Sequence, residues 1–131
     1  MDHLTLSIPD GAHVKVTDVS DDLGNLVVAG PKSRDTLAGL TDADLSNDSF
    51  KWLTGQKIEV AGIPLIALRV NYVGELGWEL HCPMDKLVEL YQAVWAAGEP
   101  HGIADVGSYA VNALRMEKAY KGWGSELTNE I

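Results

Sequence analysis

The fold is decided by residues 69–80, which read Arg69-Val70-Asn71-Tyr72-Val73-Gly74-Glu75-Leu76-Gly77-Trp78-Glu79-Leu80. The stretch predicts two strands that enclose a turn, and aromatic and acidic side chains crowd the rim of that turn. Gly74 and Gly77 allow backbone geometry that is closed to other residues. Tyr72 ends the first predicted strand and Glu79 lies in the second, so the turn can bring both side chains toward one pocket.

The chemistry of these two side chains suits a flat heterocycle. A carboxylate only accepts hydrogen bonds and can take two parallel N–H donors, which the edge of a pterin offers. A tyrosine face can stack on such a ring for about 1–3 kcal/mol, by analogy with base stacking. Two plainer interpretations stay open. One is a hairpin with an exposed acidic tip and a core tyrosine, and the other is a Glu75–Glu79 carboxylate pair for acid–base work.

Outward from this stretch, the pattern predicts an α+β fold in which helices pack on an antiparallel or mixed sheet. One domain is expected over residues 1–131, with 1–12 as an irregular lead-in. Further strands are expected at 13–19, 26–29, 57–61, 64–71 and 78–81, with a hairpin turn at Gly62. Helices are expected at 34–40 after a Ser33 cap, at 46–52, from Pro83 to Gly98, and from Asp105 to the glycines at 122 and 124.

Composition excludes several classes of function. The net charge of −9 over 131 residues argues against nonspecific binding to nucleic acid and against docking on anionic membranes. Cys82 is the only cysteine, so neither an intrachain disulfide nor a thiolate metal cluster can form. The histidines lack metal-ligand spacing, so no metal site is predicted. Neither a phosphate loop nor a dinucleotide fingerprint occurs, and no signal peptide or membrane span is visible.

Three segments together resemble a known family. The segment Tyr72–Leu80 resembles the Y-x-G-E-x-G-x-E segment of the glycine-cleavage T-protein (aminomethyltransferase) family. Residues 107–124, with the core Y-A-V-N-A-L-R-M-E-K at 109–118, are similar to the folate-binding C-terminal region of dimethylglycine and sarcosine dehydrogenases. Residues 26–34 are similar to the strand that enters a helix through "GPxSR" there. The resemblance implies the aminomethyltransferase folate-binding fold and tetrahydrofolate as the cofactor.

The resemblance also implies the residues of the site. Tyr72 and Glu79 are expected to contact the pterin, and Leu80 and His81 are candidates through their neighbourhood. Arg115 is a further folate candidate, although a structural ion pair between Arg115 and Glu117 is the preferred interpretation. No catalytic residue is predicted, because the family's catalytic aspartate has no matching segment upstream of Tyr72.

The resemblance favours the dehydrogenase branch. Val111 stands where some aminomethyltransferases carry an arginine. FAD is expected only in a longer parent protein, because the flavin domain is not in this sequence. The chain is expected to be an excised piece that is catalytically silent alone.

The function implied for the parent is transfer of a one-carbon unit from an oxidised N-methyl amine to tetrahydrofolate, with folate and amine as small-molecule partners. The expected location is the bacterial cytoplasm or the mitochondrial matrix. Two alternatives remain open. One is part of a glycine-cleavage aminomethyltransferase, and the other is a non-catalytic binding or assembly module on the same fold, in which exposed Trp78 or Trp123 contacts a partner.

Overall fold

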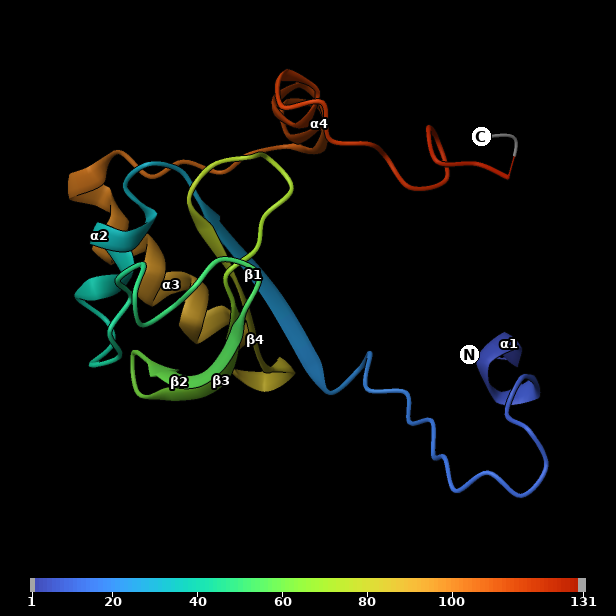
Figure 1. The fold of residues 1–131 in the computed structure, drawn as a ribbon. Coiled ribbons are helices and arrows are strands. Elements are labelled where there is room, and N and C mark those ends of the chain that lie inside the picture. The colour runs from blue at the N-terminus through green and yellow to red at the C-terminus, as the bar shows by residue number, and fades with distance from the viewer. Residues whose placement is uncertain (1, 130–131) are drawn as a thin grey trace.

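A four-stranded antiparallel sheet forms the centre of the molecule in the computed structural model, which describes residues 2–129 (Figure 1). The strands are β1 (Leu23–Ala29), β2 (Gly55–Val60), β3 (Ile63–Leu68) and β4 (Gly77–Pro83), in the order β1-β4-β3-β2. Helices α2 (Ser33–Ala38) and α3 (Leu87–Gly98) pack on the sheet, and α4 (Ser108–Glu117) lies beyond its end. The predicted α+β fold is therefore confirmed.

One face of the sheet carries the core. Side chains alternate across a strand, so every second residue points to the helices. Along β4 these are Trp78, Leu80 and Cys82, each 0% exposed. They pack with core residues of the other strands and of α2 and α3: Val28, Leu65, Ala67, Leu37, Leu90 and Val94. Burying each large side chain contributes about 1.5–3 kcal/mol, so this face holds the sheet and helices together.

The predicted hairpin forms between β2 and β3. Val60 lies opposite Ile63, which leaves a two-residue turn of Ala61 and Gly62. Both turn residues have positive φ, 52° and 78°. Two-residue hairpin turns of this kind match the right-handed twist of the flanking strands. The glycine at the second position explains why the turn could be placed from the sequence.

Two predicted elements are wrong, and a third is shorter than expected, because β3 ends at Leu68 and Tyr72 therefore lies in the turn and not at the end of a strand. Residues 13–19 form no strand, and Val14 is 60% exposed. Their alternating pattern needs a neighbouring strand, and the segment instead runs away from the sheet (Figure 1). Residues 46–52 form turns rather than a helical piece. The lead-in is not wholly irregular either, because α1 (Asp2–Leu6) lies within it.

The predicted helix boundaries shift. A 3₁₀ turn (Met84–Lys86) separates Pro83 from α3. Gly98 does not end the helical path, which continues as a second 3₁₀ turn (Glu99–His101) until Gly102 adopts φ 76°. The last helix begins at Ser108, not Asp105, and ends at Glu117, well before the glycines at 122 and 124. Ser33 opens α2 without a capping bond, since its hydroxyl donates to the Leu76 carbonyl instead.

Candidate functional site

The sheet face opposite the core carries Glu79 and His81. These residues alternate with the buried residues of β4, so both point away from α2 and α3. His81 Nε2 lies 3.4 Å from Glu79 Oε2, and the two side chains are 27% and 29% exposed. Glu79 lies opposite Val27 on β1 and Leu68 on β3. A half-exposed carboxylate therefore stands between two apolar side chains.

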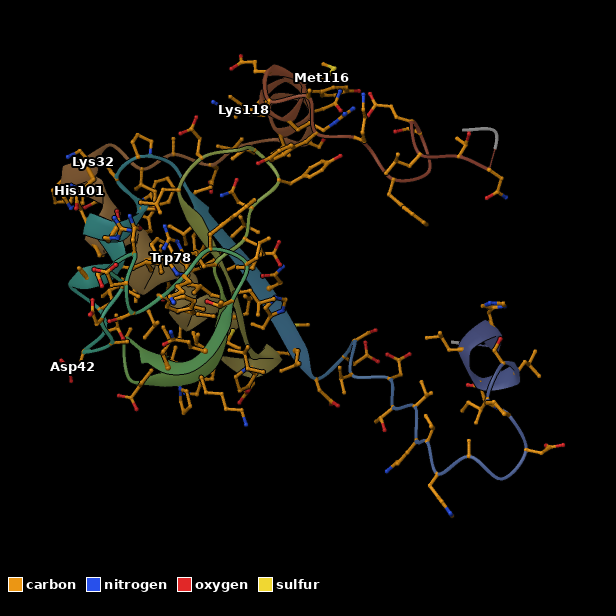
Figure 2. All side chains as sticks on the ribbon, viewed as in Figure 1. Lys32, Asp42, Trp78, His101, Met116 and Lys118 are labelled. Carbon is orange, nitrogen blue, oxygen red and sulfur yellow. The ribbon has the colours of Figure 1, made fainter. Side chains whose placement is uncertain are left out.

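Leu80 lies on the other face. It is 0% exposed and belongs to the core cluster, so it is turned away from the surface of Glu79 and His81. Trp78 is equally buried, between the sheet and the helices (Figure 2). Trp78 was expected to be a candidate for an exposed partner contact, and that expectation is wrong. Trp123, the other candidate, is 89% exposed.

Tyr72 packs on the segment that follows α4. Its ring stacks on Tyr120 with centroids 6.5 Å apart, and its hydroxyl donates to the Lys121 carbonyl at 2.6 Å. The Arg115 guanidinium lies 5.9 Å from the ring centroid. Two of the predicted site residues, Tyr72 and Arg115, thus form one cluster although they are far apart in the sequence.

Arg115 is the polar centre of this cluster. The guanidinium donates to Asn112 Oδ1 at 2.8 Å, to the Tyr120 carbonyl at 2.7 Å and to Glu126 Oε2 at 2.6 Å. The ion pair expected with Glu117 is therefore wrong, because Glu126 is the partner. The Gly122 backbone N–H and the Arg115 guanidinium both donate to Glu126 and lower the pKa of its carboxyl. No local spacing in the sequence marked Glu126.

Steric constraints explain why glycine occupies positions 74 and 77. Gly74 has φ 73°, and a Cβ there would collide with the Lys118 side chain. A Cβ on Gly77 would come within 2.8 Å of the Val28 carbonyl oxygen on β1. The turn between them is braced by Asn71, whose Oδ1 accepts the N–H groups of Val73 and Glu75. These glycines let the turn approach both β1 and the end of α4.

The predicted site residues thus fall into two pairs, with Leu80 apart from both. Glu79 lies with His81 on the open sheet face, and Tyr72 lies with Arg115 beside the C-terminal segment. Neither Tyr72 nor Glu79 lines the cavities of about 510, 400 and 270 Å³ that the described residues form. The common pocket for the two side chains remains a prediction.

A pair of arginines forms a further polar cluster that sequence reasoning missed. Arg34 and Arg69 each lie 5.8 Å from the centroid of the Trp78 ring. Both donate to Asn47 Oδ1, at 2.7 and 2.6 Å. Arg34 also donates to the Leu45 carbonyl, and Arg69 donates to the Phe50 carbonyl. Arg34 and Arg69 both lie in the segments quoted from the sequence. Nothing in the sequence showed that the two side chains meet at Asn47 and Trp78.

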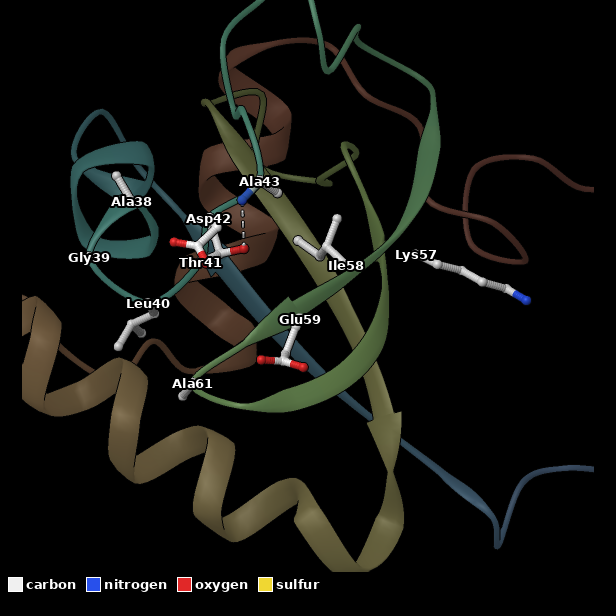
Figure 3. Close-up of a pocket in the computed structure, with 10 residues that line it drawn as sticks. All are labelled: Ala38, Gly39, Leu40, Thr41, Asp42, Ala43, Lys57, Ile58, Glu59 and Ala61. Carbon is white, nitrogen blue, oxygen red and sulfur yellow. Dashed lines mark hydrogen bonds between the residues drawn. The ribbon is translucent and has the colours of Figure 1, made fainter.

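A groove of about 510 Å³ opens at the free edge of β2 (Figure 3). It lies between residues 38–43 and 57–61, and its acidic side chains are Asp42 and Glu59. Lys57 extends away from both carboxylates. The Ala43 N–H donates to Thr41 Oγ1 at 3.2 Å and fixes the loop at the rim. The groove contains none of the predicted site residues.

Among the residues that the structure describes, no group of three or more His, Cys, Asp or Glu side chains could hold a metal ion. No helix in residues 2–129 is both long enough and apolar enough to cross a membrane. Cys82 is buried at the end of β4, and burial raises the pKa of its thiol. A buried neutral thiol is inert, so Cys82 is a core residue.

The sheet, the packed helices and the Y-x-G-E-x-G-x-E turn together define the class of the domain as α+β. Residues 1–131 match the family described as the GCVT N-terminal domain. The chain belongs to this family. A solved structure, that of the heterotetrameric sarcosine oxidase from Corynebacterium sp. U-96 in complex with pyrrole 2-carboxylate, shares the fold. The TM-score is 0.63 at 22% identity, over 74% of this chain and 49% of that chain.

Curated relatives are more similar in sequence. The chain is 46% identical over 121 residues to the mitochondrial dimethylglycine dehydrogenase of Homo sapiens, covering 92% of this chain and 14% of that protein. It is 41% identical over 126 residues to the human mitochondrial sarcosine dehydrogenase, covering 95% and 14%. An aminomethyltransferase from Caldanaerobacter subterraneus is 34% identical over 118 residues, covering 90% and 31%. The chain thus spans about a seventh of the length of the two dehydrogenases.

Proposed function

We propose that this chain forms part of a tetrahydrofolate site in which the Glu79 carboxylate binds the edge of the pterin. The supporting observation is the position of Glu79 on the open face of the sheet. Its neighbours across the strands, Val27 and Leu68, offer no hydrogen-bond donor side chain. A carboxylate with free lone pairs on an apolar surface suits a flat ring that carries paired N–H groups.

We place Tyr72 in a second wall of the proposed site and Arg115 behind it. Tyr72 is 42% exposed, although Tyr120 and Arg115 lie against its ring. We assign Tyr72 to the pterin and give Arg115 the task of holding the Tyr72 loop against the C-terminal segment. His81 acts beside Glu79, and Leu80 supports the strand from the core.

In the proposed role, the site receives a one-carbon unit released from an oxidised N-methyl amine. The relatives named as dimethylglycine and sarcosine dehydrogenases support this role, since they are 46% and 41% identical to the chain. FAD would do the oxidation in a separate domain, and this chain would position the folate. The two dehydrogenase relatives are named as mitochondrial proteins, which supports a mitochondrial location or its bacterial counterpart for this chain. An aminomethyltransferase role is the second candidate, supported by a relative at 34% identity.

Isothermal titration of tetrahydrofolate into the full-length protein tests the assignment of Glu79. A hydrogen bond to a charged group contributes about 1.5–3 kcal/mol, so Glu79→Gln should weaken binding by about ten- to a hundredfold. Glu59→Gln is the matched control, because Glu59 is an exposed glutamate on the same sheet, at its β2 edge. Equal affinities for the wild type and Glu79→Gln would overturn the proposed function.

A further inference from the structure

The Nε2 atom of His81 has an unusual environment on the sheet. The atom is buried and makes no hydrogen bond among the described residues. A buried polar atom without a partner costs about 1–3 kcal/mol, so such an atom needs an explanation. The Glu79 carboxylate is the acceptor within reach, at 3.4 Å, slightly longer than an ordinary N–H···O bond.

The rows of side chains across the sheet isolate this pair. The row through Glu79 consists of Val27, Glu79, Leu68 and Gly55, and it contains no cation. The row through His81 consists of Asn25, His81, Ile66 and Lys57, and Lys57 lies two strands away from His81. Of the side chains in these two rows, His81 is the one whose N–H-bearing ring lies against the Glu79 carboxylate, at 3.4 Å.

From this geometry we infer that His81 is a positioning residue, which holds the Glu79 carboxylate in place for the ligand without touching the ligand itself. A proton on Nε2 faces Glu79 Oε2, whereas a bare lone pair there would face a negative oxygen. The inference rests on the proposed function, because it assigns the group that orients the Glu79 carboxylate for folate.

One bond from His81 leaves the carboxylate able to bind a fork of two donors. An ionised carboxylate has two oxygens and about four lone-pair sites. His81 occupies one site on Oε2, so the other site on Oε2 and both sites on Oε1 stay available. Fixing the carboxylate in advance removes the entropy cost of ordering it when the ligand binds, which raises affinity.

The test compares tetrahydrofolate affinities of the full-length protein and its variants. His81→Leu should weaken binding by about three- to tenfold, the cost of ordering one flexible side chain. His81→Gln should restore binding to within about twofold, because its amide N–H reaches toward Glu79 as the imidazole does. Lys57→Gln is the control, since Lys57 lies in the same row at the sheet edge. Circular dichroism checks that each variant is folded.

A double-mutant cycle separates the two ideas. In a Glu79→Ala background, which leaves no acceptor for the imidazole, His81→Leu should have no further effect, because its action passes through the carboxylate. Three results would overturn the inference: an unchanged affinity for His81→Leu, no restoration of binding by His81→Gln, or an equal loss in both backgrounds. The proposed function still stands in each case if Glu79→Gln binds tetrahydrofolate weakly. If Glu79→Gln alone binds as the wild type does, both proposals fall.

Discussion

Trp78 offers the sharpest test of the packing argument. The ring is 0% exposed, meets Phe50 edge-on at 6.1 Å and lies beneath the guanidinium groups of Arg34 and Arg69. Its indole Nε1 is buried without a hydrogen-bond partner among the described residues. Replacing the indole by a phenyl ring thus removes favourable contacts and one unfavourable group together, and the magnitudes decide the outcome.

The losses in Trp78→Phe come from three sources. A residual cavity of roughly 40 Å³ costs about 1 kcal/mol at about 24 cal/mol per Å³. The lost apolar area costs about 0.7 kcal/mol for roughly 30 Å² at about 25 cal/mol per Å². Weaker contacts with the two guanidiniums cost about 0.5 kcal/mol, since phenylalanine is a poorer cation–π partner than tryptophan. Removing the unpaired N–H returns about 1–3 kcal/mol.

The expected net change for Trp78→Phe is therefore a loss of at most about 1.2 kcal/mol. Trp78→Ala, which leaves a large cavity, should cost about 3–5 kcal/mol. Urea unfolding followed by far-ultraviolet circular dichroism measures both, and it avoids the fluorescence of the residue being changed. A loss of 3 kcal/mol or more in Trp78→Phe would refute the reasoning, because it would mean that Nε1 is hydrogen-bonded in solution.

Two further predictions concern titratable groups. The Gly122 N–H and the Arg115 guanidinium lower the pKa of the Glu126 carboxyl. The packing of residues 120–127 against Arg115 is therefore stabilised fully at pH values above the pKa of the unfolded carboxyl. This stabilisation is lost as the pH falls through the lower pKa of the folded state. The protection factors of the amides in residues 120–127, which correct for the intrinsic pH dependence of exchange, should fall below about pH 4.5, and Glu126→Gln should abolish that fall. Burial raises the pKa of the Cys82 thiol, so its alkylation by iodoacetamide should be slow in the folded protein and rapid in urea. Fast alkylation of the native protein would contradict the buried position.

The elements that could be predicted from the sequence carry their own local signals. The β2–β3 hairpin has a glycine at the turn, and α3 has an apolar stripe at helical spacing. Residues 13–19 alternate just as clearly, but a strand needs a neighbour, and the alternation alone does not provide one. A local sequence pattern thus predicts an element correctly only where it also specifies the segment that the element packs against.

The candidate site shows the same limit. Glu79 and His81 were placed correctly on one strand, and the alternation of β4 puts them on one face. The same alternation turns Leu80 toward the core. Leu80 was named as a site candidate only because it is next to Glu79 in the sequence. The partner of Arg115 was misjudged because Glu117 is close in sequence, whereas Glu126 approaches only after the chain turns at Ala119, where φ is 58°. Such turns at non-glycine residues carry little sequence signal.

The shared amide oxygen of Asn47 has a consequence for the order in which the molecule folds. The loop at 41–54 has no regular ladder of its own. It buries Leu45 and Phe50 in the core, and Arg34 from α2 and Arg69, which follows β3, bind its Asn47 side chain. Both anchors reach it from elements that must already be in position, so closing this loop follows their assembly. We expect the loop to join late on the folding pathway, with little native structure in the transition state.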